Sequence, residues 1–478
     1  MSSGKRGHGF AQVEEIWKFG ELEGKVRRDR SGDMRQRQEL HLSRLTEIMS
    51  SQGVNRLYVK RLSPNDNSKN QVYFGPGFEA INIIPNKGVH AEQALTRTIL
   101  KAAVDMAWTD EAGALHNAPE TKMILYPQYP EVRMSGFLKG CRQAPSEIMA
   151  SRDPGRVLFL GIRNDGKVIA YATSAETAVV RELDALGQLP AAGVFHEITI
   201  GAGGERVAAR ETLISRLRRI HLLDWIDSHR LRIDGSWIPC NASNCGGYTL
   251  EAELGVTPNG FAEPDFMGWE VKQHGVPDFT RPDRGSPVTL MTPEPTGGYY
   301  RDAGVEAFIR RFGYPDTLGR SDRLNVGGIF RVGTRAPRTG LTLVLDGYNV
   351  EKKMIVDISK GITLLTDDDE IAAVWHFAGL IEHWKRKHDR AAYIPSECRT
   401  EPQRQYRYGH LVNLGEGTDF LLLLVALGQG DVYYDPGIKL EQVSGSRPLV
   451  KRRSQFRVKW EKLGALYRSM ETFDVLSA

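Results

Sequence analysis

The most informative stretch of this sequence, for both its fold and its chemistry, is GGYTLEAELGVTPNGFAEPDFMGWEVKQ, at residues 246–273. Residues 249–254 predict the last part of a helix, and Gly255 is expected to end it, because glycine readily adopts the left-handed conformation of a helix cap. In residues 269–272 apolar and charged side chains alternate, which predicts a strand with one apolar and one charged face. The stretch therefore predicts a helix, a turn and a strand in close succession.

Charged side chains converge on one face of this predicted strand. Glu270 and Lys272 project from the same face, and Asp265 lies just before the strand, where a turn can bring its carboxylate beside Glu270. On the preceding helix, Glu251 is the better candidate for a third carboxylate. Carboxylates held close together need a cation, and hard oxygen ligands favour Mg²⁺. Asp265, Glu270 and Glu251 are therefore the candidate metal ligands.

This set of residues fits the hydrolysis of a phosphodiester. A Mg²⁺ ion would polarise the phosphate and lower the pKa of a bound water. Lys272 would orient that water and stabilise the charge that develops in the transition state. Attack in line with the leaving 3′ oxygen would leave a 5′-phosphate. His274, on the same face as Lys272, would contact phosphate or assist proton transfer, and a purely structural histidine is the alternative.

The spacing of these residues is a weak signal by itself, because the chain contains it twice. The second copy runs from Asp346 to Glu351-Lys352-Lys353, with a lysine between the glutamate and the last lysine. Its far face would be exposed, so we interpret it as a hairpin tip with solvated charges. For the first copy, a surface strand with ion pairs is the structural alternative.

The run TLEAELGVTPNGFAEPDFMGWEVK resembles the active-site segment of MvaI/BcnI-type restriction endonucleases, a branch of the PD-(D/E)xK nuclease superfamily. It is also similar to mismatch-repair nicking endonucleases of the MutH type. In those families a helix Glu in an L-E-x-x-L-G context precedes an Asp and then Gly-x-Glu-x-Lys. Four residues separate the Asp from the Glu here, as in the restriction branch, whereas the repair branch has a longer gap. The matching positions are Glu251, Asp265, Glu270 and Lys272.

The resemblance implies a type II restriction endonuclease that cuts double-stranded DNA at specific sites and defends against phage. It implies Mg²⁺ as the cofactor, with Mn²⁺ as a substitute, and a cognate DNA methyltransferase as a partner in the same system. Two alternatives stay open. One is a nicking, repair or defence-effector nuclease that needs a partner or a signal, and the other is a DNA-binding protein with an inert nuclease fold.

The chain is too long for one ordinary domain. Its 478 residues predict two or three domains, and 41% hydrophobic with 26% charged residues indicate a globular protein. We predict a separate α+β domain over residues 1–195, with a DNA-engaging or regulatory role. An α/β (α+β) nuclease domain, implied by the resemblance to be a mixed sheet flanked by helices, is predicted over 200–478. Its catalytic core is expected at about 205–390, and its DNA-recognition elements within about 290–478.

Local patterns predict some individual elements. Apolar residues at helical spacing favour helices over 92–107 and 205–230, and a short β-type run favours a strand at 80–84. Asn164-Asp165-Gly166 between two apolar runs predicts a hairpin. Acidic residues at its start and basic residues at its end favour a helix over 367–387.

Cysteines and apolar runs bear on the compartment. Cys240 and Cys245 are the only close pair among four cysteines, and we interpret them as buried thiols, with a metal role as the alternative. The first residues lack an apolar signal segment, and the longest apolar run, 420–427, is too short to span a membrane. These features predict a soluble, cytoplasmic protein.

Charge allows a nucleic-acid partner without requiring one. Lysine and arginine number 63 against 59 acidic residues, a net charge of +4. Basic clusters at 25–37 and 451–462 are predicted to contact the DNA backbone, with solvated surface as the alternative. The candidate DNA-binding residues are His274, Arg331, Arg335, Arg407, His410, Lys451, Arg452 and Arg453.

Overall fold

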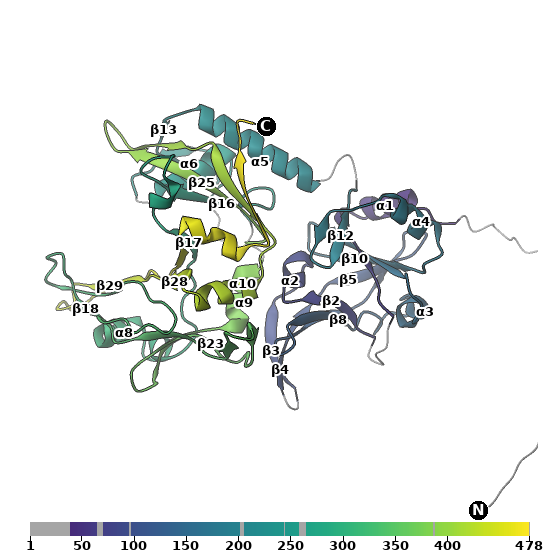
Figure 1. The fold of residues 1–478 in the computed structure, drawn as a ribbon, viewed down its shortest axis with the longest axis horizontal. Helices are drawn as coiled ribbons and strands as arrows, with labels where there is room; N and C mark the ends of the chain where they lie inside the picture. The colour runs from purple at the N-terminus through teal and green to yellow at the C-terminus, as the bar shows by residue number, and fades with distance from the viewer. Residues whose placement is uncertain are drawn as a thin grey trace, which may run out of the picture. The chain divides into compact units, whose positions relative to one another are not determined.

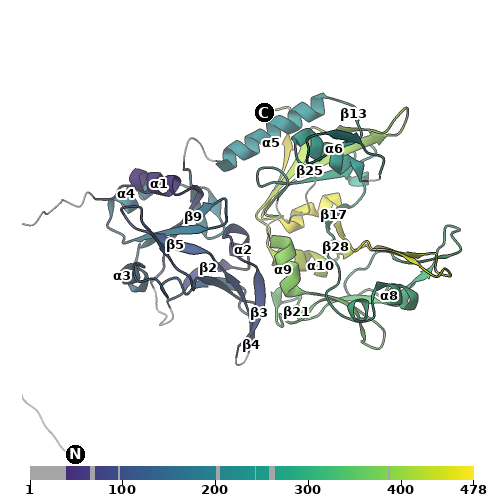
Figure 2. The ribbon, with the colours of Figure 1, turned by 180° about the vertical axis from the view of Figure 1, so that it is seen from behind.

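The computed structural model describes residues 39–64, 70–94, 97–200, 205–242, 244–257, 264–385 and 388–477. The helices and strands of Figures 1 and 2 belong to one compact unit, Leu40–Ala478. The basic cluster at 25–37 and the glycine-rich residues 201–204 lie outside the described residues. No helix in the described ranges is long and apolar enough to cross a membrane.

Residues 40–200 form a strand-rich region with two sheets of its own (Figure 1). Its helices are α1 (Leu42–Ser51), α2 (Ala80–Ile83), α3 (Ser146–Ala150) and α4 (Ala178–Ala185). The seven-stranded sheet contains, in spatial order, β11 (Ala191–Ala192), β12 (Phe195–Ile198), β1 (Val54–Arg61), β9 (Val157–Arg163), β10 (Val168–Thr173), β5 (Met106–Thr109) and β6 (Leu115–Asn117). The five-stranded sheet contains β2 (Val72–Pro76), β8 (Glu131–Ser135), β7 (Lys122–Tyr126), β4 (Arg97–Ala103) and β3 (Val89–Ala94).

Two predictions for the strand-rich region are wrong, and both errors have the same cause. Residues 92–107, predicted as a helix, run through β3, β4 and β5, and residues 80–84, predicted as a strand, contain α2. A short apolar spacing fits either conformation. In β4 the buried Leu100 and Ala102 alternate with a lysine, and pairing with β7 decides the outcome. The hairpin predicted at 164–166 is confirmed, because β9 and β10 pair antiparallel on either side of it.

A mixed sheet in residues 205–477 holds the strand predicted at 269–272. Its strands are, in spatial order, β13 (Ile226–Asp227), β26 (Gln405–Tyr408), β25 (Arg390–Arg399), β27 (Leu411–Glu416) and β32 (Ser469–Asp474), with β16 (Glu270–Gly275) parallel to β25. The helices α5 (Glu205–Leu222) and α6 (Cys245–Leu254) pack on one face, where Trp269 and Val271 are buried (Figure 2). The predicted alternation is thereby confirmed. The left-handed Gly255 (φ +80°) ends α6 as predicted, whereas α5 stops before the predicted residue 230.

The rest of the C-terminal part consists of small sheets and short helices. Two strand pairs are β14 (His229–Leu231) with β15 (Trp237–Pro239), and β21 (Tyr348–Asn349) with β22 (Met354–Ile355). One three-stranded sheet contains β17 (Val288–Met291), β31 (Phe456–Val458) and β28 (Val432–Tyr434), and the other β20 (Thr342–Leu345), β23 (Gly361–Leu365) and β24 (Ile371–His376). A four-stranded sheet contains β18 (Tyr314–Pro315), β19 (Arg323–Gly327), β29 (Gly437–Glu441) and β30 (Leu449–Lys451). The helices are η1 (Pro282–Arg284), α7 (Tyr299–Asp302), α8 (Val305–Phe312), α9 (Phe377–Lys385), α10 (Phe420–Gly428) and η2 (Trp460–Leu466).

The helix predicted over 367–387 is wrong in its first half. Its acidic start lies in the turn between β23 and β24, and residues 371–376 form β24. Trp375 is buried there and lies opposite Ile362 of β23, so strand pairing outweighs the favourable helix-dipole pattern. Only α9 follows the prediction.

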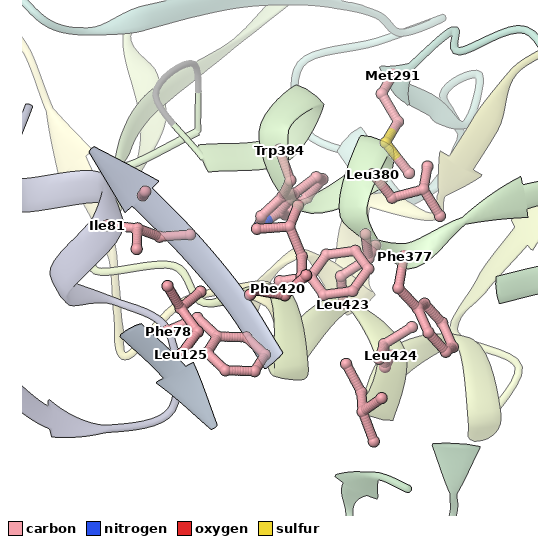
Figure 3. Close-up of a cluster of buried hydrophobic side chains, with 14 of the residues drawn as sticks. Phe78, Ile81, Leu125, Met291, Phe377, Leu380, Trp384, Phe420, Leu423 and Leu424 are labelled. Carbon is pink, nitrogen blue, oxygen red and sulfur yellow. The ribbon is translucent and has the colours of Figure 1, made fainter. Parts of the chain in front are cut away.

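The strand-rich region and the C-terminal part share one hydrophobic core. Phe78, just before α2, and Ile81, within α2, are buried in the same cluster as Trp384 of α9 and Phe420 of α10 (Figure 3). Beside this cluster, the carboxylate of Asp419 accepts hydrogen bonds from the backbone N–H groups of Phe78 and Leu421, both at 2.9 Å. One buried side chain therefore caps α10 and binds the strand-rich region.

The cysteine pair differs from its predicted state. Cys240 follows β15 and Cys245 begins α6, and the intervening turn brings their Cα atoms within 5.8 Å, where they form a disulfide. Both side chains are buried as predicted, but they are not free thiols. The bond fixes the start of the helix that carries Glu251.

Candidate active site

Lys272 and Glu270 form an ion pair on the face of β16 opposite the helices. The Lys272 Nζ atom donates to Glu270 Oε1 at 2.8 Å, and the two side chains are 17% and 2% exposed. Burial by itself lowers the pKa of Lys272. The charge and hydrogen bond of Glu270, with smaller contributions from Tyr393 and Asp265, outweigh burial and raise the pKa of Lys272 above its usual value. The ammonium is therefore held in its charged form.

A tight turn places Asp265 next to this pair, as the sequence predicts. Phe266 and Trp269 exchange backbone hydrogen bonds of 2.9 and 2.8 Å, which closes the turn before β16. Asp265 Oδ2 accepts a hydrogen bond of 3.1 Å from the backbone N–H of Val271. The turn thus fixes the carboxylate of Asp265 at the start of the strand that carries Glu270 and Lys272.

Gly268 is required in this turn. Its φ of +82° is left-handed, and a Cβ atom would lie 2.6 Å from Arg390 Nη2. We expect Gly268→Ala to lower the free energy of unfolding by about 1–3 kcal/mol, as for other strained backbone positions. Urea unfolding checks this value. Gly379→Ala is the control, since Gly379 lies in α9 with no atom within 4 Å of its Cβ position, and should be neutral or stabilising. Equal midpoints for the two variants would contradict the role assigned to the turn.

Glu251 reaches the same groove as Lys272. The groove has a volume of about 1010 Å³, and Tyr248 and Glu251 of α6 line it together with residues 272–275 of β16. Its lining also includes Asn244, Gly247, residues 286–292, His383, His388, Arg453 and Arg457. In the described part of the chain, no three His, Cys, Asp or Glu side chains are close enough to hold a metal ion. Glu251 therefore shares the groove without completing a three-ligand cluster.

The nearby donor atoms are those that a hard cation prefers. Asp265 and Glu270 supply carboxylate oxygens, and both lie close enough to Lys272 to raise its pKa. His274 is 2% exposed, and its Nε2 is bonded to the backbone oxygen of Pro282 at 2.9 Å, so this nitrogen is not available as a ligand. An all-oxygen donor set fits Mg²⁺ or Mn²⁺ better than zinc.

His274 itself has a structural environment. It is 2% exposed, its ring stacks on Trp460 at 4.3 Å, and burial lowers the pKa of its imidazole. The structure places it along the groove wall, but with its ring enclosed. A purely structural histidine therefore describes His274 better than a histidine that contacts phosphate directly.

Of the other predicted DNA-binding residues, Arg453 alone lines the groove with Lys272. Four others are bound to carboxylates: Arg335 to Asp367 at 2.7 Å, Arg407 to Glu397 at 2.7 Å, Lys451 to Glu441 at 2.6 Å and His410 to Asp474 at 2.9 Å. Arg331 lies over the ring of Tyr433 at 5.3 Å, and Arg452 is exposed. The structure therefore does not bring the predicted set together.

The groove also contains His388, which the sequence did not single out, and Arg457, which lies in the basic run predicted to contact the DNA backbone. His388 stacks on Trp384 at 4.1 Å and bonds the backbone oxygen of Leu290 at 3.0 Å. Arg457 binds Asp435 at 2.8 Å and the backbone oxygen of Pro287. The basic run 451–462 was a usable signal for Arg457, whereas a single histidine gives no such signal.

The second copy of the spacing is not a site of this kind. Asp346 pairs with Lys360 at 3.1 Å, and residues 351–353 are exposed in the loop between β21 and β22. The interpretation as a hairpin tip with solvated charges is confirmed.

Two carboxylates and a lysine at one edge of a helix-flanked mixed sheet define a restriction-endonuclease-like fold. A comparison with protein families matches residues 214–467 to the MvaI/BcnI restriction endonuclease family. The chain belongs to this family, which confirms the resemblance seen in the sequence.

The solved structures that this chain resembles include two of restriction endonuclease MvaI. The complex of MvaI with its cognate DNA is 19% identical, with a TM-score of 0.40, and the match covers 54% of this chain and 96% of MvaI. MvaI without DNA is 18% identical, with a TM-score of 0.30, covering 55% of this chain and 97% of that one. No curated protein matches the sequence.

Proposed function

We propose that this protein is a type II restriction endonuclease that cuts double-stranded DNA at specific sites and leaves 5′-phosphate ends. The observation that carries the proposal is the Lys272–Glu270 ion pair, with Asp265 beside it, at a groove of a restriction-endonuclease family member. A cognate DNA methyltransferase in the same system stays a prediction.

Each residue has a distinct task in the proposed reaction. Asp265 and Glu270 would hold Mg²⁺, with Glu251 as a further ligand from the groove wall. When bound, the ion would polarise the scissile phosphate and lower the pKa of a water. The charged ammonium of Lys272 would hold the attacking water and stabilise the negative charge that grows on the phosphate oxygens. The buried environment of Glu270 strengthens these electrostatic contacts.

Digestion of unmodified phage and plasmid DNA tests the proposal. The protein is incubated with Mg²⁺, with Mn²⁺ or with EDTA, and the ends of the fragments are sequenced. Discrete fragments that share one sequence at their 5′-phosphorylated ends are expected, with none in EDTA. A smear, or activity that needs a second protein, would favour the effector or nicking alternatives. No metal-stimulated cleavage of any unmethylated DNA would favour the inert-fold alternative.

Arg453 is expected to contribute to DNA affinity, because it lines the groove and pairs with no carboxylate among the described residues. Arg453→Ala should weaken binding by about threefold to tenfold and reduce the salt dependence by about one phosphate contact. Fluorescence anisotropy with labelled duplex DNA, at several salt concentrations without Mg²⁺, measures both. Arg335→Ala is the matched control, since Asp367 already engages its guanidinium. Equal losses for the two variants would show that the groove is not the DNA site.

A further inference from the structure

Two buried tyrosines lie beside the Lys272–Glu270 ion pair. In the parallel pairing of β16 with β25, Lys272 lies opposite Tyr393, so the two side chains project from the same face of the sheet. Tyr393 is 0% exposed, and its hydroxyl is hydrogen-bonded to that of Tyr467 at 2.8 Å. The active-site face of the sheet therefore has a buried polar contact beside its charged pair.

Neighbouring contacts hold Tyr467 in place. It follows η2 and precedes β32, and its ring meets that of Tyr393 edge to face at 6.2 Å. The residue before it, Leu466, accepts a hydrogen bond of 2.6 Å at its backbone oxygen from the hydroxyl of Thr418. The residue after it, Arg468, donates its backbone N–H to the backbone oxygen of Gly417 at 3.0 Å. The tyrosine hydroxyl is thus held at a fixed point of the fold.

Both hydroxyls stay neutral at any working pH. Burial raises the pKa of Tyr393 to about 12 and the pKa of Tyr467 well above its usual value. Tyr393 lies within electrostatic reach of both Lys272 and Glu270. A neutral hydroxyl there can act only as a hydrogen-bonding group, and its partner at 2.8 Å is the hydroxyl of Tyr467.

We propose that Tyr467 is a positioning residue, whose hydrogen bond with the hydroxyl of Tyr393 keeps Lys272 and Glu270 bonded to each other in the cleavage-competent arrangement. Loss of the Tyr467 hydroxyl frees Tyr393 to donate to Glu270. That new bond competes with the one from Lys272, and the ammonium loses its fixed position. The proposal rests on the proposed nuclease function, for which Lys272 must be accurately placed.

Single-turnover cleavage of an identified DNA site by the full chain tests this proposal. Tyr467→Phe is expected to lower the cleavage rate by about tenfold or more, as for other displaced catalytic groups. Tyr393→Phe lacks the hydroxyl that would compete for Glu270, and should cleave within about twofold of the wild-type rate. DNA affinity without Mg²⁺ should stay within twofold for both variants. For the same reason the double variant should recover most of the rate that Tyr467→Phe loses.

Tyr434→Phe separates positioning from a general loss of packing. Tyr434, in β28, is 1% exposed and does not line the groove, so its variant should lose similar stability and keep its cleavage rate. Wild-type rates for Tyr467→Phe, or an equal loss for Tyr434→Phe, would overturn the positioning role alone. A wild-type protein that cuts no DNA would overturn the proposed function, and the positioning role with it.

Discussion

Lys272→Ala is expected to lower the rate of DNA cleavage by about a hundredfold to a thousandfold or more, because it removes the charge beside the reacting phosphate. The ammonium of Lys272 is held charged by Glu270 at the groove. DNA affinity should stay within about twofold, since the side chain is largely buried and makes a small part of the groove surface. Single-turnover cleavage and anisotropy titrations measure the two quantities separately.

The same substitution also affects stability, and a second variant separates the two effects. Glu270 is 2% exposed, so removing its cation leaves a buried charge and costs about 3–5 kcal/mol. Lys272→Arg keeps a cation beside Glu270 but replaces the compact ammonium with a planar group. It should unfold at nearly the wild-type urea concentration and still cleave DNA much more slowly.

The chain supplies its own matched control for the spacing. Lys353 is the lysine of the second copy and lies exposed in the loop between β21 and β22. Lys353→Ala should cleave and bind DNA at wild-type levels. Wild-type cleavage by Lys272→Ala, or an inactive Lys353→Ala, would refute the assignment of the site to β16.

Asp419→Ala is expected to lower the free energy of unfolding by about 3 kcal/mol, because two buried N–H donors would lose their acceptor. These donors belong to Phe78 and Leu421, on the two sides of the shared core. Urea unfolding should give the value. Asp234→Ala is the control, since Asp234 also accepts a backbone hydrogen bond, from Ser236 at 2.9 Å, but is exposed. Its change should be well below that of Asp419→Ala.

Gly77, which lies against the carboxylate of Asp419, offers an independent test of this contact. Gly77 is left-handed, with φ +71°, and a Cβ atom there would lie 2.2 Å from Asp419 Oδ2. Gly77→Ala should therefore destabilise the protein by a similar amount. Because the two residues share one contact, the double variant should lose less than the sum of the single losses. Strict additivity would mean that Asp419 does not join the two regions.

Much of the candidate site could be predicted because its residues are close in sequence. The cap at Gly255, the turn after Asp265 and the alternation in 269–272 are local features, and the structure contains all of them. Local patterns also sufficed for the hairpin at 164–166.

The wrong predictions arose where distant segments decide the local conformation. β4 is a strand because β7 pairs with it, and β24 is a strand because β23 does. Tyr393 and Tyr467 reach the site only through sheet pairing and a side-chain contact, for which the sequence carries no periodic signal. Arg335 and Arg407 were predicted to bind DNA, but each pairs with a carboxylate, Asp367 and Glu397, on another segment of the chain.

The strands that form the site are far apart in the sequence, so they become available for folding at different times during synthesis. Lys272 leaves the ribosome long before its neighbours in β25, and Tyr467 and β32 follow about 200 residues after it, a delay of about 10–40 s at usual bacterial and eukaryotic rates. Until then the sheet lacks β32, and Tyr393 lacks the hydroxyl of Tyr467 as its partner. A chain of this nuclease that is released before Tyr467 would therefore carry Asp265, Glu270 and Lys272 without the complete sheet that holds them in place. It would not be expected to cut the DNA of the cell.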